Sequence, residues 1–493
     1  MRTRSLLLWV AIAWSFTLSA TTFTVTNSNA SGEGSFAEAF TNSANGDVIN
    51  FNFDGTTINL TDVVAMKSLT INGLNAFNNQ KVIIKQTTAS KNFMTLATGI
   101  TVTLNNLIFD GSAGASTICI TAVNGSTLNI DNCVFRNINA GASNGAACRI
   151  QGAATITNSV FENNTCSGSY GGGAVCVYNA ADVTIDKCSF IGNTSLKNGN
   201  SGGGALVARG TVATACNVKI SNSTFANNIS EFYGGAILSS VQSSTAYTVN
   251  VTAVNCTFTG NKGDGAISAV TTANGTANVY LVNSIVANNV NAAATAYSDL
   301  QETKGTNAAT VVLIEPHNVI YSAASETVVT AGRNCVQVAD PATANIFYEL
   351  ETFATDKKRP VLTDTMGQTV ALISESSIAK GAGVATLSGY TIPTVDQLNS
   401  SRPATPAIGA VEYLLGTSVP GIDDNSSIDL TVKGRELIVS GLKNDAEMSV
   451  YGLAGNLLHK SMVSNDQAVS LENISAGLVI VKVQNQSFKL LLK

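Results

Sequence analysis

Short stretches in which apolar and polar residues alternate recur through the middle of the chain, as in Thr127–Ile130 and Val183–Asp186. A period of two predicts β-strands that bury one face. Each stretch is followed by a short segment that begins with Asn, or once with Lys, and ends in Phe. The last residues of these segments are Phe109, Phe135, Phe161, Phe190, Phe225, Phe258 and finally Val286, at intervals of 26, 26, 29, 35, 33 and 28 residues. Self-similarity at this period is typical of a solenoid.

Asn and Gly mark the corners of the repeat. Asn-rich turns follow the Phe, as at Asn163–Asn164, and Gly-rich steps come next, as at Gly171–Ala174 and Gly202–Ala205. Both residue types tolerate the left-handed backbone of tight corners. Three short strands per repeat, without a helical pattern, predict an all-β fold, a right-handed parallel β-helix. Its Phe residues should stack in an internal column, with coils ~4.8 Å apart. A sandwich of antiparallel strands is the competing interpretation.

Residues 21–60 are predicted to form the N-terminal cap and the first coil. They offer a strand at Phe23–Thr26 and a short amphipathic helix at Phe36–Phe40. A cap protects strand edges that would otherwise template aggregation. This order of elements resembles the N-terminal part of secreted right-handed β-helix proteins. The GGAI and FxxN repeats of residues 61–297, the predicted β-helix proper, are similar to those of polymorphic outer-membrane proteins.

From residue 298 to residue 415 the repeats degrade. Ser377–Gly383, Asp396–Gln397 and Ala407–Glu412 follow one another in an order that resembles the choice-of-anchor Q region. That resemblance implies a segment that closes the β-helix ahead of a variable anchor. The family has Asp where Ala407 stands, and Leu398–Asn399 also depart from its pattern. An Arg402–Glu412 pair is expected here with a structural role.

Residues 416–427 are predicted to be a linker, and residues 428–493 a separate small β-sandwich domain. The tail contains five strand-like runs, with a hairpin turn at Tyr451–Asn456. Its segment Ile474–Val483 and the terminal Phe488 resemble the type IX secretion sorting domain of Bacteroidota, in which Tyr is common where Val479 stands. The resemblance implies that the secretion machinery is a partner. An ordinary sugar-binding sandwich module is the alternative.

The first twenty residues are predicted to be a signal peptide rather than part of the fold. Arg2 and Arg4 precede an apolar run, Leu6–Trp14, and cleavage after Ser19 or Ala20 fits a signal peptidase. The run is too short for a stable membrane-spanning helix, although an N-terminal anchor is the alternative. No other segment is long and apolar enough to cross a membrane. We expect export through the inner membrane, followed by secretion or attachment to the outer-membrane surface.

The charge content narrows the classes of function. Only 12% of residues are charged, and the net charge is −5, which excludes a basic nucleic-acid binder. The chain has two His, at His317 and His459, too few for a credible Ser-His-Asp set. No cofactor, metal or catalytic residue is predicted. Asp423–Asp424 lie in the linker, away from any cleft.

Nine Cys fall between residues 119 and 335, without a CxxC motif. Cys133, Cys188 and Cys256 each stand two residues before a Phe, on the inward face, and Ser takes that place in other coils. Small thiols that fill the core are the favoured interpretation. Stacked coils also permit a disulfide between Cys148 and Cys176.

β-Helix enzymes that act on polysaccharides need clustered carboxylates. Thirteen charged residues lie between Gly111 and Val290, and they form no cluster in the sequence. Asp182 and Asp186 share one face of a strand and are expected to face solvent. We therefore predict an exported, adhesin-like or structural surface that binds polysaccharide or host matrix, without a transmembrane segment. Whether the chain is an enzyme stays open, and a polysaccharide lyase or glycoside hydrolase with a divergent site is the alternative.

Overall fold

The computed structural model describes residues 20–114, 117–179, 181–196, 201–243, 245–271, 274–303, 312–314, 318–320, 336–337, 345–354, 356–413, 429–433, 435–442, 444–452, 456–475, 477–483 and 486–492. The predicted signal peptide except Ala20, the predicted linker, His317 and Cys335 lie outside these residues.

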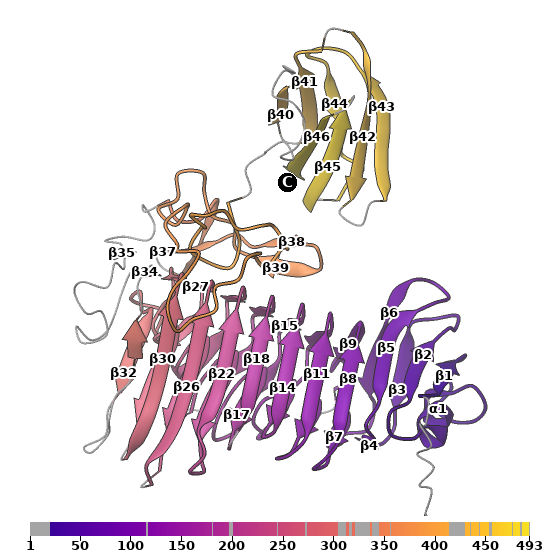
Figure 1. Ribbon diagram of the computed structural model, residues 1–493, viewed down its shortest axis with the longest axis vertical. Coiled ribbons are helices and arrows are strands. Elements are labelled where there is room, and N and C mark those ends of the chain that lie inside the picture. The colour runs from indigo at the N-terminus through magenta and orange to yellow at the C-terminus, as the bar shows by residue number, and fades with distance from the viewer. Residues whose placement is uncertain are drawn as a thin grey trace, which may run out of the picture.

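The repeats fold, as predicted, into an all-β, right-handed parallel β-helix of about nine turns (Figure 1). Three parallel sheets, named A, B and C here, run along the stack. Sheet A consists of β1 (Thr22–Val25), β2 (Val48–Phe51), β5 (Thr70–Asn75), β8 (Thr101–Asn105), β11 (Thr127–Asp131), β14 (Ala153–Thr157), β18 (Asp182–Asp186), β22 (Cys216–Ser221), β26 (Tyr247–Val254), β30 (Gly275–Val282) and β33 (Val312–Ile314). Sheet B consists of β3 (Thr57–Leu60), β6 (Gln80–Gln86), β9 (Leu107–Asp110), β12 (Val134–Arg136), β15 (Val160–Glu162), β19 (Ser189–Ile191), β23 (Thr224–Ala226), β27 (Thr257–Thr259), β31 (Ile285–Ala287), β34 (Val319–Ile320) and β35 (Val336–Gln337).

Sheet C consists of β4 (Val64–Ala65), β7 (Met94–Leu96), β10 (Ile120–Ala122), β13 (Cys148–Ile150), β17 (Val175–Tyr178), β21 (Leu206–Gly210), β25 (Ile237–Val241), β29 (Ile267–Thr271) and β32 (Leu300–Thr303). A shorter fourth sheet, made of β16 (Thr165–Cys166), β20 (Thr194–Ser195), β24 (Ile229–Tyr233) and β28 (Lys262–Asp264), lies between sheets B and C along the chain. Successive coils therefore repeat the same order of strands, which places equivalent residues above one another.

The N-terminal cap contains the predicted helix, α1 (Phe36–Asn42). The Ser35 hydroxyl accepts a hydrogen bond from Glu38 N, and Glu38 Oε2 accepts one from Gly34 N, so the first turn is satisfied from both sides. Phe36 is buried, and its ring lies 6.1 Å from that of Phe51 between centroids. The helix thus covers the apolar interior of the first coil.

The predicted Phe column is confirmed. Six rings from Phe109 to Phe258 are fully buried, and each stacks on the next with centroids 4.5–5.0 Å apart. The register of sheet B sets this arrangement, because Phe161 pairs with Phe135 on one side and with Phe190 on the other. Val286 takes the next place, opposite Phe258.

A second internal column consists of asparagines. Its members are fully buried and are Asn164, Asn193, Asn228, Asn261 and Asn289. Asn228 shows the pattern: its Nδ2 donates to Asn261 Oδ1 and to the carbonyl of Phe190, each at 2.9 Å. The sequence predicts these residues in turns. The structure leaves the first Asn of a pair at the corner and turns the second inward, where neighbouring coils satisfy its amide.

Left-handed corners explain the rest of the repeat. Between sheets A and B the corner residue has φ between +44° and +57° in seven coils and is Asn106, Asn132, Asn158, Lys187, Asn222, Asn255 or Asn283. The Gly-rich step carries a second such position. At Gly203 φ is +69°, and a Cβ there would lie 2.2 Å from the carbonyl oxygen of Leu206. Only glycine fits that site without displacing backbone.

Part of region 298–415 leaves the stack. Its strands β32 to β35 still pair with coil strands, but residues 345–413, named the strap here, fold back across the outer face of sheet B (Figure 1). The strap contains two hairpins, formed by β36 (Leu350–Ala354) with β37 (Lys357–Pro360) and by β38 (Thr363–Thr365) with β39 (Gln368–Val370).

Polar contacts fasten the strap to sheet B. Ser189 Oγ donates to Gln368 Oε1 at 2.8 Å, and Thr224 Oγ1 donates to Gln397 Oε1 at 2.7 Å. The predicted Arg402–Glu412 pair is present inside the strap. The strap covers this part of sheet B, and outward-facing side chains such as Ser189 and Thr224 are therefore fully buried.

The tail forms small antiparallel sheets, as predicted. One sheet contains β40 (Asp429–Lys433), β41 (Glu436–Ser440) and β44 (Ala468–Ser470). The other contains β42 (Ala446–Gly452), β43 (Leu457–Val463), β45 (Gly477–Val483) and β46 (Gln486–Leu492). Both sheets contribute to one apolar cluster, which includes Leu437 and Val481 and is separate from the core of the β-helix.

The eight described cysteines are buried and free; seven of them fill the core of the β-helix, as predicted, and Cys176 lies outside it. The Cys148–Cys176 disulfide is wrong. Strand β13 pairs with β17 so that Cys148 lies opposite Val175, while Cys176 lies opposite Arg149. The one-residue offset turns Cys148 inward and Cys176 outward, because successive side chains of a strand point to opposite faces. No helix in the described residues is long and apolar enough to span a bilayer.

Candidate functional site

The outer face of sheet C brings together residues that are distant in the sequence. Strand register aligns Arg149 with Cys176 and Val207, and aligns Tyr178 with Arg209, over three consecutive coils. All five side chains are on the outward face, since they alternate with inward core residues such as Ile150 and Ala208. We name this surface the sheet C site.

An apolar stripe forms the floor of the sheet C site. Its buried members are Cys176, Val207, Leu238 and Val270, and Tyr170, Tyr178 and Tyr233 pack against them. Tyr170 belongs to the segment between β16 and β17, and Tyr233 ends β24. Residues from the corner before sheet C therefore lie against its outer face. The result is an apolar and aromatic surface outside the core of the β-helix.

The aromatic rings and one arginine are in contact. The rings of Tyr170 and Tyr178 meet edge-on, with centroids 5.8 Å apart and planes inclined by 73°. Arg209 Cζ lies 4.1 Å from the centroid of the Tyr170 ring, which is a cation–π contact. This contact holds the guanidinium beside the ring. Burial lowers the pKa of Arg209, while Tyr170 and Cys176 act in the opposite direction.

Both arginines of the site retain unused donors. Arg149 Nε and Arg209 Nη1 are buried and have no hydrogen-bond partner within the described segments. Neither side chain forms an ion pair with any described carboxylate. Burial raises the pKa of the Cys176 thiol, and the charges of Arg149 and Arg209 both oppose that shift. The charges of both arginines therefore influence the same thiol, that of Cys176.

A hydrogen-bond chain fixes Tyr178. Gln151 Nε2 donates to the Tyr178 hydroxyl, Asn179 Nδ2 donates to Gln151 Oε1 at 3.3 Å, and Thr211 Oγ1 donates to Asn179 Oδ1. Burial raises the pKa of Tyr178, and the charge of Arg149 opposes the shift. The site thus offers two fixed aromatic rings, two cations and several amide groups.

A second group of charges lies on the outward face of sheet B. Asp110, Arg136 and Glu162 occupy one outward column on three consecutive coils. Arg136 Nη2 lies 3.0 Å from Asp110 Oδ2, and Ser112 N donates to Asp110 Oδ1 at 2.8 Å. Along the sequence, neither Arg136 nor Glu162 belongs to a cluster of charged residues. Stacking of coils produces one, and we name it the sheet B column.

The two carboxyls of the sheet B column differ in environment. Burial alone would raise the pKa of Asp110, but hydrogen bonds from Ser112 and Arg136 hold it below its usual value. Burial raises the pKa of Glu162, Arg136 opposes the shift, and Asp364 of the β38–β39 hairpin adds to it. Because Arg136 and Ser112 already occupy both oxygens of Asp110, the column contains a closed Arg136–Asp110 ion pair rather than an open acid–base pair.

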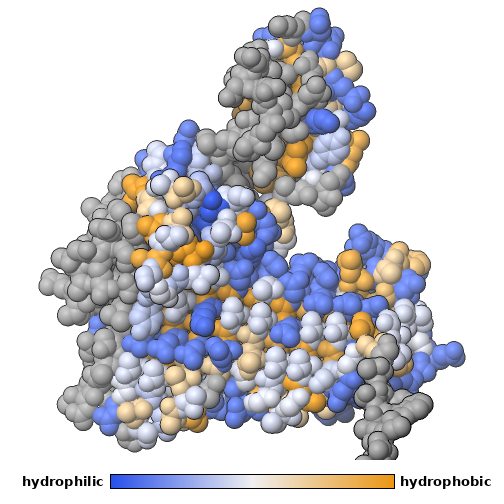
Figure 2. Space-filling view, viewed as in Figure 1, coloured by the Kyte–Doolittle hydropathy of each residue, from blue (hydrophilic) through white to orange (hydrophobic). Residues whose placement is uncertain are grey.

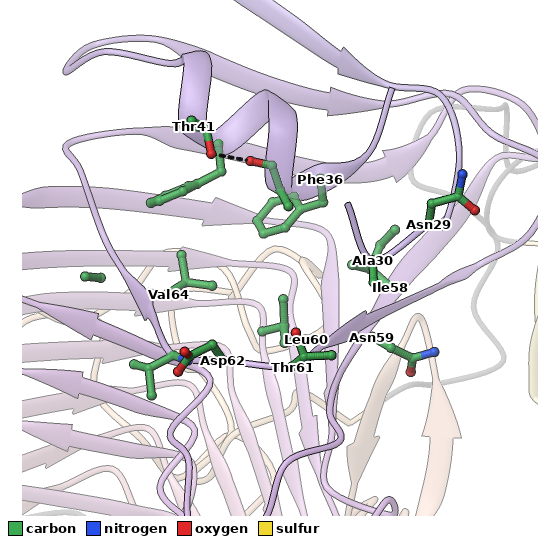
Figure 3. A pocket seen from close by; sticks show the side chains of 14 residues that line it. Asn29, Ala30, Phe36, Thr41, Ile58, Asn59, Leu60, Thr61, Asp62 and Val64 are labelled. Atoms are coloured by element: carbon green, nitrogen blue, oxygen red, sulfur yellow. Dashed lines mark hydrogen bonds between the residues drawn. The ribbon is translucent and has the colours of Figure 1, made fainter. Parts of the chain in front are cut away.

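A cavity of about 360 Å³ lies beneath the N-terminal cap. Figure 3 shows Phe36 of α1 facing Ile58 and Leu60 of the first coil. The wall is mainly apolar, and its one carboxylate, Asp62, is paired with Lys91 at 2.7 Å. These groups offer no paired acid and base for chemistry.

The outer face of sheet A is polar and uncovered. It faces the viewer in Figures 1 and 2, where pale and blue residues of intermediate and low hydropathy are interspersed with orange ones. Asp182 and Asp186 lie on this face, as predicted, with Asp182 exposed and Asp186 accepting a hydrogen bond from Ser221 Oγ. Within the described ranges, no group of three or more His, Cys, Asp or Glu could hold a metal ion.

Reasoning from sequence missed the sheet C site. Arg149 and Arg209 stand 60 residues apart, so proximity along the chain gives no sign of it. A signal exists in the left-handed glycine of each coil: Arg149 follows Gly145 by four residues, whereas Tyr178 and Arg209 follow Gly172 and Gly203 by six. Even offsets fall on one face of a strand. Alignment on these glycines, rather than on the Phe, would have placed the three side chains together.

A match to a family model agrees with the fold. A family model described as the right-handed β-helix region matches residues 97–290. Among solved structures, the crystal structure of pectate lyase Pel9A is similar at 14% identity and a TM-score of 0.33, covering 81% of this chain and 98% of that chain. No curated protein sequence matches the chain.

Proposed function

We propose that the chain is an exported β-helix protein that binds polysaccharide through the sheet C site. The observation that carries the proposal is the contact of Tyr170 with Arg209 and Tyr178 above an apolar stripe. A sugar ring has an apolar face of C–H groups and an edge of hydroxyls. Fixed aromatic rings can contact the face, and the amides of Gln151 and Asn179 can contact the edge.

The repeat of the stack favours a polymeric ligand. Each coil advances the surface by ~4.8 Å, so equivalent groups recur along the rod. The apolar stripe itself spans four consecutive coils, from Cys176 to Val270. A ligand with its own repeating units can therefore make successive contacts, which raise affinity by effective concentration.

The enzymatic alternative has less support. Glycoside hydrolysis needs two carboxyl groups that reach the same bond, one of them free to activate water or attack carbon. In the sheet B column both oxygens of Asp110 are engaged, and Asp182 stands apart on sheet A. A binding surface of the adhesin type is the function that these contacts favour.

We expect Tyr170→Ala to weaken polysaccharide binding by about tenfold or more, because central aromatic contacts commonly contribute 1–2 kcal/mol or more and ~1.4 kcal/mol is a factor of ten. The measurement is isothermal titration of the purified full chain with polysaccharides selected from a panel of neutral and acidic polymers. Tyr280→Ala, a matched change on the outward face of sheet A, should leave affinity unchanged. Equal losses in both variants would refute the assignment of the sheet C site.

We also propose that residues 1–20 direct export and that residues 428–493 act as a type IX sorting domain, placing the protein outside the cell or on the outer-membrane surface. The separate apolar cluster of the tail supports an independent domain.

Deletion of residues 428–493 should leave the β-helix folded and trap it in the periplasm. Cell fractionation measures this outcome. Undiminished surface display would contradict the sorting role and favour a sugar-binding tail.

A further inference from the structure

We infer that the sheet C site selects anionic polysaccharides, whose acidic groups bind to Arg149 and Arg209. This inference rests on the proposed binding of polysaccharide at the same site and adds the chemical class of the ligand.

The first argument is the state of the two guanidinium groups. A buried N–H without a partner costs free energy, and Arg149 Nε and Arg209 Nη1 are both in that state within the described part of the chain. A guanidinium presents its donors in a planar fork that matches carboxylate and sulfate oxygens. The contact of Arg209 with Tyr170 involves the face of the ring and leaves donors at the guanidinium edge.

The second argument is that, among the described residues, the strand columns of the site contain no neutralising group. The neighbours in the strand columns are Cys176, Val207, Leu238 and Ser240, none of which carries a negative charge at neutral pH, and burial raises the pKa of Cys176 further. The sheet B column is different, because Arg136 is held there by Asp110. Although the whole chain carries −5, this surface is locally positive. Local positive charge attracts an anion and disfavours a neutral competitor only weakly.

The third argument is spacing. Arg149 and Arg209 lie two coils apart, which is ~9.6 Å along the axis at ~4.8 Å per coil. Two acidic groups on different sugar units of one chain can each pair with one of these arginines, with Tyr170 and Tyr178 contacting the rings between them. The arrangement fits a polymer with recurring acidic groups better than a single small anion.

The experiment compares three probes: alginate, carboxyl-reduced alginate and dextran sulfate. The full chain should bind alginate at least tenfold more tightly than its reduced form, and added salt should weaken that binding. In Arg149→Gln/Arg209→Gln the preference for alginate over its reduced form should disappear, because neither polymer then meets a cation at the site. Binding of dextran sulfate shows whether sulfate can replace carboxylate. If only dextran sulfate binds through the two arginines, the acidic group is sulfate and the inference holds.

Controls separate this inference from the proposed function. Lys219→Gln removes an exposed cation of sheet A and should change nothing; an equal effect would mean unspecific attraction and overturn the inference. Arg209→Lys keeps the charge but loses the fork, and it should retain only part of the preference. If alginate and its reduced form bind equally, and Tyr170→Ala abolishes both, the site binds polysaccharide without selecting acids. If the unaltered chain binds none of the probes or panel polymers, both proposals fail.

Discussion

Phe190→Ala is expected to destabilise the β-helix by about 3–5 kcal/mol, the range for removal of a buried aromatic ring from a core. Phe190 is fully buried, and its centroid lies 4.6 Å from that of Phe161 and 4.5 Å from that of Phe225, with planes inclined by 3°. Backbone pairing of β19 to β15 and β23 fixes the distance between neighbouring coils. The coils cannot close the gap, so the variant should retain most of the cavity.

Denaturant unfolding of the full chain measures the loss, and hydrogen exchange locates it. Exchange should increase first in the coils that contain Phe161, Phe190 and Phe225, because each repeat of a solenoid contacts only its neighbours. Phe77→Ala is the matched control, since Phe77 is 60% exposed and its loss should cost no more than about 0.5 kcal/mol. If Phe190→Ala lowers the free energy of unfolding by less than about 1 kcal/mol, the stabilising role that we assign to the Phe column is wrong.

The sequence predicts those parts of the fold that repeat. The Phe positions recur at every coil because stacked strands demand one inward ring at each step. Asn and Gly recur near the corners, as at Asn222 and Gly203, because few other residues adopt a positive φ there. The period of the repeat therefore reflects requirements of the local backbone and of the core, and the sequence alone reveals both.

Features that depend on register between coils escaped prediction. The Cys148–Cys176 disulfide is wrong because the Gly-Ala steps that precede the two cysteines are one residue out of register: Cys148 lies opposite Val175, so Cys148 and Cys176 point to opposite faces. Register also explains why the sequence does not reveal the sheet C site. The positions of Arg149 and Arg209 within their strands, rather than their neighbours in sequence, decide that both side chains lie on the same face. The path of the strap was also hidden, since contacts such as Thr224 with Gln397 join residues 173 positions apart.

Arg402→Met should detach the strap from sheet B. The Arg402 side chain is 2% exposed; its Nη1 donates to Glu412 Oε1, and its Nη2 donates to Asn222 Oδ1 at 3.0 Å and to the carbonyl of Gly409 at 3.1 Å. Removal of one partner from a buried ion pair commonly costs 3–5 kcal/mol, because the other charge stays buried without compensation. Burial already raises the pKa of Glu412, and Arg402 opposes that shift, so the variant should favour protonated Glu412.

The consequence should be local. The asparagine and Phe columns lie inside the stack, whereas Arg402 joins the strap to the corner residue Asn222 on its outer surface. Limited proteolysis should therefore cut the variant within residues 345–413 while the coils stay protected. Arg359→Met is the control: the Arg359–Glu351 pair is partly exposed and should contribute no more than about 1 kcal/mol.

A double variant tests whether the buried charge is the cause. Arg402→Met/Glu412→Leu removes both charges, and apolar replacement of a whole buried pair is often neutral for stability. It should recover much of the protease resistance, although the carbonyls of Gly409 and Ala410 still lack their Arg402 donor. If the single and double variants are equally sensitive, the lost carbonyl contacts fasten the strap rather than the ion pair. If strap and coils unfold together in the single variant, the strap is an integral part of the stack, and the division between them is wrong.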